Sequence, residues 1–140
     1  MRLGKGKRSA PPEAVRRALE RIFGDAAAAL AQVRVIEHSW FARLHGRAIA
    51  TTRRRRIFLR GSAAQFFSNP ELMLHEYCHV LRQWETRSLT TLRYVHECLR
   101  HGYWNNRFEI EARDFAHENL ERFWNLLRAD PDQPSSRSRR

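Results

Sequence analysis

The stretch that most constrains this chain is residues 75–79, which read His-Glu-Tyr-Cys-His and match the pattern H-E-x-x-H. In an α-helix, side chains four positions apart lie on the same face, so His75 and His79 can present two imidazoles to one metal ion. Glu76 lies about 100° around the helix from His75, within reach of a water molecule beside that metal. The pattern has three fixed positions only. It therefore indicates a metal site only if the chain also supplies a helix, a third ligand and a cleft.

The residues before the motif predict the helix. Asn69 is a good capping residue, Pro70 suits the first helical position, and Glu71 places an acid in the first turn. We expect a helix over about residues 70–85. The two histidines and Glu76 share one side of it, and the opposite side carries Met73, Tyr77, Val80 and Trp84. A mostly apolar helix is typical of a buried one, so we expect the motif to line a cleft.

A catalytic zinc ion usually has three protein ligands, and the last predicted helix, about residues 105–127, offers two acids for the third place. Glu109 lies about 35° from the centre of the apolar stripe of this helix, and Glu111 lies about 125° from it. An inward-facing carboxylate is costly unless it is paired or binds a metal. We therefore predict Glu109 as the third ligand. The alternative is an ion pair of Glu109 with Arg82 or Arg113.

The rest of the chain predicts one α+β domain over residues 11–128, between disordered tails at 1–10 and 129–140. We expect a helix ending near Gly24, strands at 33–37, 48–52 and 56–60, a short helix at 39–46, and a further helix beginning at Ser88. No apolar run reaches the length of a membrane span, and no hydrophobic region follows the basic N-terminus. These features predict a cytoplasmic protein, or one exported by a specialised secretion system. They do not predict an oligomeric state.

The net charge of +11 favours an anionic partner such as nucleic acid, a lipid surface or a wall polymer. Compositional bias toward arginine explains the charge equally well. The four arginines at 53–56 could contact phosphates, or they could form the solvated tip of a hairpin. The strand at 56–60 could pair its edge with an extended substrate.

Two parts of the chain together resemble a known family. The motif at 75–79, followed by Asn-Arg-Phe-Glu-Ile-Glu-Ala at 106–112, resembles the small, often bacterial gluzincin-type metallopeptidase-like domains. Residues 33–36, 48–52, 57–59 and 74–76 also resemble the uncharacterised domain associated with contractile injection systems. The resemblance covers about residues 33–117. It implies a zincin-like fold, in which a small antiparallel or mixed sheet packs on the motif helix and a long C-terminal helix.

The resemblance also implies a metal site and an activity. Zn²⁺ would be held by His75, His79 and Glu109, with Glu76 as the general base of peptide-bond hydrolysis. The reaction also needs an oxyanion partner, for which Tyr103 and His101, just before the last predicted helix, are candidates, and the substrate would be a protein or peptide. The chain departs from the family pattern at two positions near the ligands. Arg107 stands where proline is usual, and Arg113 stands where aspartate is common.

Two other functions remain open from the sequence. The chain could be a catalytically silent binding or scaffold protein of the same fold, in which His96, His101 or His117 adds a further ligand to the metal. It could also associate with nucleic acid through its arginine-rich surface, either alone or to bring a peptidase to its substrate.

Overall fold

The computed structural model of the 140-residue chain describes residues 8–39, 42 and 50–132. The fold is α+β, with a small mixed sheet and a long C-terminal helix. Its elements are β1 (Arg8–Ser9), α1 (Glu13–Phe23), η1 (Gly24–Gln32), β2 (Arg34–Ile36), β3 (Ala50–Arg53), β4 (Arg56–Leu59), α3 (Ala63–Phe67), α4 (Pro70–Cys78), η2 (His79–Trp84), α5 (Thr91–His101) and α6 (Arg107–Ala129). No helix in these ranges is long and apolar enough to cross a membrane.

The sheet has the strand order β1-β2-β4-β3, which makes β3 an edge strand and places β4 inside. β2 and β4 are parallel, and β3 and β4 form an antiparallel hairpin whose turn contains Arg54 and Arg55. The arginine run is therefore a hairpin tip, and Arg55 there pairs with Glu85 at 2.8 Å. The edge strand that we expected at 56–60 is not at the edge, because β2 occupies its other side.

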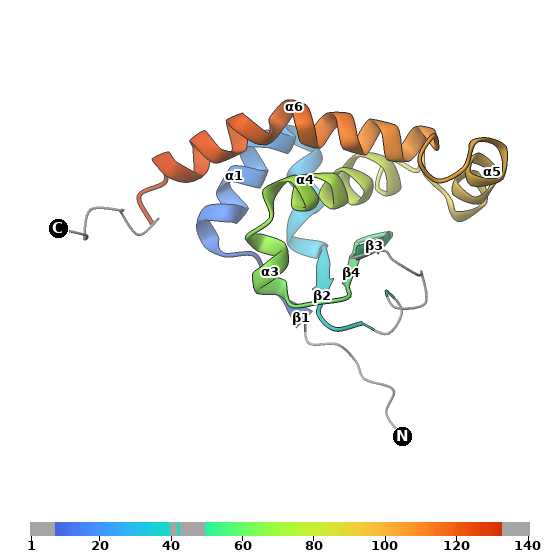
Figure 1. Cartoon of the computed structure of the whole chain (residues 1–140). Helices are drawn as coiled ribbons and strands as arrows, with labels where there is room; N and C mark the ends of the chain where they lie inside the picture. Colours follow the sequence, from blue (N-terminus) through green and yellow to red (C-terminus); the bar gives the residue numbers. More distant parts are fainter. Residues whose placement is uncertain (1–7, 40–41, 43–49, 133–140) are drawn as a thin grey trace, which may run out of the picture.

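The helices stack on this sheet in layers. In Figure 1, α6 runs along one side of the molecule, α1 and α4 lie beneath it, and the sheet lies on the far side of α4. The apolar faces of these elements meet in one core, which includes Leu19, Ile57, Leu74, Tyr77 and Phe123. The motif helix is thus covered on one side by α6 and on the other by strands.

The ends of several elements follow the local sequence signals. α1 ends at Gly24, which adopts a φ of 56° that a side chain would strain. α4 begins after Asn69, whose side chain accepts from the amide of Leu72, with Pro70 in the first turn. The helix expected from Ser88 begins instead at Thr91 and is capped by Thr90.

Parts of the expected tails are ordered. Arg8 and Ser9 pair with β2 as the strand β1, although the sequence analysis placed them in a tail. At the other end, Arg17 holds the Asp130 carboxylate with two hydrogen bonds of 2.9 Å. Residues 1–7 and 133–140 of the expected tails lie outside the described ranges, as does the expected helix at 39–46 apart from Ser39 and Ala42.

Candidate metal centre

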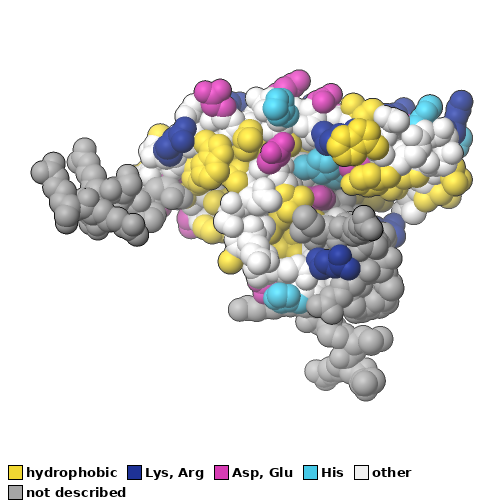
Figure 2. Space-filling model, viewed as in Figure 1, with side chains coloured by type: hydrophobic (Ala, Val, Ile, Leu, Met, Phe, Trp, Pro, Cys, Tyr) yellow, Lys and Arg dark blue, Asp and Glu magenta, His cyan; other side chains and the backbone are white. Residues whose placement is uncertain are grey.

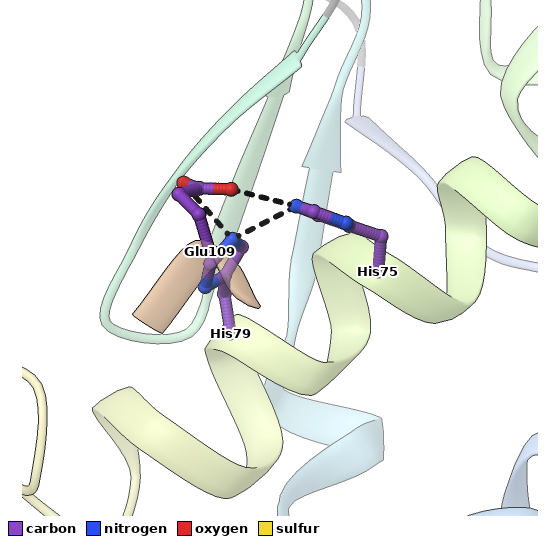
Figure 3. A group of neighbouring side chains, drawn as sticks. All are labelled: His75, His79 and Glu109. Carbon is purple, nitrogen blue, oxygen red and sulfur yellow. Dashed lines mark hydrogen bonds and ion pairs between the residues drawn. The ribbon is translucent and has the colours of Figure 1, made fainter. Parts of the chain in front are cut away.

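The structure brings the three predicted ligands together. His75 and His79 project from adjacent turns of the motif helix, and Glu109 reaches them from the first turn of α6 (Figure 3). The Nε2 atom of His75 lies 2.9 Å from Oε2 of Glu109 and 3.2 Å from Nε2 of His79. The Nε2 atom of His79 lies 3.3 Å from Oε1 of Glu109. Among the described residues, this is the cluster whose donor atoms converge as metal ligands do.

The spacing of these donors fits a tetrahedral metal ion. Ligands at the usual zinc distances of about 2.0–2.1 Å lie about 3.3 Å from one another in a tetrahedron. The two imidazole nitrogens lie 3.2 Å apart, close to that separation, and each lies within 3.3 Å of a different oxygen of the Glu109 carboxylate, Oε2 for His75 and Oε1 for His79. Two imidazoles and one carboxylate are also a donor set that zinc accepts, with a fourth position left for water.

Two hydrogen bonds of the Gln83 side chain determine which ring nitrogen of His79 carries the proton. The side-chain amide nitrogen of Gln83 donates to the Phe108 carbonyl at 2.9 Å, so the amide oxygen of Gln83 faces His79. That oxygen accepts from Nδ1–H of His79 at 2.6 Å. A proton held on Nδ1 leaves the Nε2 lone pair free for a metal. Gln83 is buried and lies in η2, a π-helical turn in which the amide of Glu85 donates to the carbonyl of Val80.

The Glu109 carboxylate is held on both sides. Besides its contacts with the histidines, its Oε1 accepts from the Tyr94 hydroxyl at 2.9 Å. Burial by itself raises the pKa of Glu109, but the hydrogen bonds from His75 and His79 outweigh it and hold the pKa far below its usual value. Burial also opposes protonation of His79, yet Glu109 and Glu76 raise the pKa of His79 to about 9. The contact between the two side chains thus favours the charged form of each.

Glu76 lies next to this cluster in a different environment. It is buried, and burial raises its pKa, opposed by the neighbouring histidines. A carboxylate with a raised pKa beside a metal site suits a group that takes a proton and then returns it. The general-base role assigned to Glu76 from the sequence stays a prediction.

A cleft of about 340 Å³ opens on the cluster. Glu76, His79 and Glu109 line it, as do all four residues of the edge strand β3. Leu89, Tyr94, Val95 and Tyr103 are among the residues that line the rest. The strand beside the cleft is thus β3 and not the predicted segment 56–60, because β4 pairs on both sides.

Tyr103, one of the two oxyanion candidates, lines this cleft, and its side chain is largely exposed. Burial of part of the ring and the nearby Glu109 carboxylate raise the pKa of Tyr103 to about 12, so its hydroxyl stays protonated. His101, the other oxyanion candidate, is exposed at the end of α5 and is not among the residues that line the cleft.

The alternative roles considered for several side chains are not what the structure shows. Arg82 stacks on Phe115 and Arg113 on Trp104, so neither is the partner of Glu109. Glu111 is exposed, as its position on the helix predicted. His96, His101 and His117 are exposed and do not belong to the described metal cluster.

Two residues of the site were not found from the sequence. Gln83 stands four positions after His79, the spacing that places two helical side chains together, and this signal was available. Tyr94 had no such signal. It reaches Glu109 because α5 lies against the start of α6, and a local pattern does not report how two helices pack.

Comparison with protein families adds one finding. Residues 10–87, more than half of the chain, match the model of the eCIS core domain, where eCIS denotes the extracellular contractile injection system. The chain belongs to the eCIS core domain family. This confirms the resemblance to the domain associated with contractile injection systems. Comparison with curated proteins and with solved structures gave no match. The matched range of the eCIS core domain includes His75, Glu76, His79 and Gln83, whereas Glu109 lies beyond it.

Proposed function

We propose that this member of the eCIS core domain family is a zinc-dependent metallopeptidase with a zincin-like fold. The observation that carries the proposal is the cluster of donor atoms, in which two imidazole nitrogens of the motif helix lie 3.2 Å apart and each lies within 3.3 Å of a carboxylate oxygen of Glu109 on α6. His75, His79 and Glu109 would hold Zn²⁺. The buried Gln83 and the Tyr94 hydroxyl support the inference, because outer hydrogen bonds of this kind orient metal ligands.

Each residue of the site has a role in this reaction. Bound zinc supplies a Lewis acid that makes a water molecule acidic near neutral pH. Glu76 takes the proton of the attacking water and delivers it to the leaving amine. The Tyr103 hydroxyl, protonated and at the cleft, donates a hydrogen bond to the oxygen that becomes negative. Glu109 and the histidines keep the metal in place throughout.

The substrate would be a polypeptide in an extended conformation. β3 is an edge strand that lines the cleft, and an edge strand can pair with an extended chain through backbone hydrogen bonds. Leu89 and Val95 make part of the cleft apolar, which suits peptide side chains. Family membership supports a further part of the proposal, namely that the protein acts in association with a contractile injection system.

The test is metal content together with peptidase activity. Protein purified without added metal should contain about one zinc per chain and should cleave a library of unstructured peptides. Glu76→Gln should keep the zinc and lose the activity, by a factor of about 100 or more. Glu111→Gln, an exposed acid on α6, is the matched control and should behave as the wild type. A wild type without metal, or a Glu76→Gln variant that still cleaves, would overturn the proposal.

A second candidate function is association with nucleic acid, and one feature of the sheet favours it. Arg34 and Arg53 both pair in register with Arg56, so three arginines lie side by side across neighbouring strands. Like charges directly opposite each other destabilise a sheet, and an anionic partner would offset that cost. Retention on a DNA column that falls steeply with salt, and that is lost in Arg34→Gln/Arg56→Gln, would support this function. Absence of retention at low salt would remove it.

A further inference from the structure

The helix α5 presents its apolar side chains to solvent. None of its residues is buried, and Leu92 and Leu99 expose 84% and 83% of their surface. Val95 is also exposed on the same face, and Tyr103 and Trp104 follow directly after the helix with most of their surface open. Figure 2 shows hydrophobic side chains gathered at the end of the molecule that Figure 1 assigns to α5. We call these five residues the α5 apolar face. Several large apolar side chains exposed together on one helix and the segment after it indicate a binding surface.

The orientation of α5 is fixed from its inner side. Tyr94 donates to Glu109, and the Asn106 side chain donates to the Tyr94 carbonyl and to the Cys98 sulfur. Asn106 is itself fully buried and caps α6. Rotation of α5 to bury Leu92 and Leu99 would break these contacts and withdraw a hydroxyl from the Glu109 carboxylate. The hydrogen bonds of Tyr94 and Asn106 therefore keep the α5 apolar face turned toward solvent.

Basic side chains flank the α5 apolar face. Arg93 and Arg100 are exposed on the same helix, and the Arg113 guanidinium lies 4.0 Å from the centre of the Trp104 ring. The helix carries one acid, Glu97, which is engaged with Arg107 at 3.6 Å. An amphipathic helix with leucines on one side and arginines on the other, followed by aromatic residues, has the composition of helices that lie in the interface of an anionic membrane.

The charge of the chain helps to identify the occupant. A second copy would bring together two chains of net charge +11, with basic residues around both apolar faces. A bilayer with anionic headgroups complements both features, because it accepts leucine side chains and attracts arginine. A flat surface can also reach α5, because the helix lies at one end of the molecule (Figure 1).

We propose that α5 docks the protein on an anionic lipid surface, with Leu92, Val95 and Leu99 entering the boundary of the hydrocarbon layer. Tyr103 and Trp104 then lie at the level of the headgroups, where amphipathic aromatic rings are favoured. Val95 and Tyr103 also line the cleft, so the docked protein holds the mouth of the cleft beside the membrane. Docking on lipid does not require peptidase activity, although the α5 apolar face shares Val95 and Tyr103 with the cleft.

The experiment is flotation of the full chain with lipid vesicles. The wild type should float with vesicles of equal parts phosphatidylcholine and phosphatidylglycerol, and not with pure phosphatidylcholine. Leu92→Ser/Leu99→Ser should lower the partition coefficient by about tenfold for each leucine replaced. Trp104→Ser should weaken binding, whereas Trp124→Ser, which alters a partly exposed tryptophan of α6 instead, should not. Far-UV circular dichroism checks that each variant is folded.

A second pair of variants separates insertion from charge alone. Arg34→Gln/Arg56→Gln removes charge from the sheet and should leave flotation nearly unchanged, whereas Arg93→Gln/Arg100→Gln should weaken it at low salt. The proposal is overturned if the wild type does not float with anionic vesicles. It is also overturned if Leu92→Ser/Leu99→Ser floats as the wild type does. If that variant instead changes only peptide cleavage or the mass in solution, the face binds substrate or a second copy and the lipid assignment is wrong.

Discussion

The helices α4 and α5 are neighbours in sequence with opposite environments. Both are capped by a side chain and both carry regularly spaced apolar residues. α4 buries Met73, Leu74 and Tyr77 between α6 and the sheet, whereas α5 buries none of its residues. Helical periodicity therefore predicts that a helix forms and which face is apolar, but not whether that face is covered. Whether the apolar face is covered depends on which side of the helix makes the polar contacts. In α5 these contacts, made by Tyr94 and Cys98, lie on the side that faces the rest of the molecule.

The largest effect that separates the two helices should come from deleting a leucine side chain. Leu74→Ala removes a fully buried side chain of α4 and should lower the free energy of unfolding by about 2–5 kcal/mol. Leu99→Ala on α5 should change it by less than about 0.5 kcal/mol, because that side chain is already hydrated. Urea unfolding followed by circular dichroism measures both. Equal losses would mean that α5 is packed in solution.

Removal of a bound metal should lower the stability of α4 and α5 together. Zinc bound to His75, His79 and Glu109 would join α4 to α6 and, through Tyr94, to α5. The free energy of unfolding should rise by about 2.7 kcal/mol when free zinc is about 100 times the dissociation constant. A chelator should abolish this gain in the wild type and have no effect on Glu109→Gln. Stabilisation by zinc that survives Glu109→Gln would place the metal elsewhere.

Gln83 offers a smaller change within the buried region. Gln83→Leu removes the acceptor for Nδ1–H of His79 and leaves the Phe108 carbonyl without its donor. Zinc affinity should fall by about 10–100-fold, as is typical when an outer hydrogen bond to a ligand is lost. Competition with a chromophoric chelator measures the affinity, and nitrogen NMR reports the His79 tautomer. Gln32→Leu, at an exposed position, should leave both readouts unchanged.

The smallest effects concern the helix caps. Asn69→Ala removes the cap of α4 and should lower global stability by about 1 kcal/mol. Thr90→Ala removes the equivalent cap of α5, and its effect should be local because little of the core depends on α5. Amide hydrogen exchange should show faster exchange in residues 91–101 of Thr90→Ala, with an unchanged urea midpoint. A shift of that midpoint as large as that of Asn69→Ala would contradict the contrast between the helices.

The parts of the fold that local chemistry determines could be predicted from sequence. Asn69 and Pro70 predicted the start of α4, Gly24 the end of α1, and the wheel position of Glu109 its burial beside the histidines. Sheet order was not predictable in this way, because the parallel pairing of β2 with β4 joins strands about 20 residues apart and places β4 inside. The exposure of Leu92 and Leu99 was equally hidden, since it follows from tertiary contacts of Tyr94 and Asn106.

The position of Glu109 beyond residues 10–87 bears on where this domain can be cut. A fragment that stops at Arg87 would retain the five-residue motif but would lack the Glu109 carboxylate that completes the donor cluster. It would also lose α6, which covers the motif helix, and so expose Leu74 and its neighbours to water. The smallest autonomous unit of this protein therefore has to extend well past the boundary that sequence similarity alone would draw.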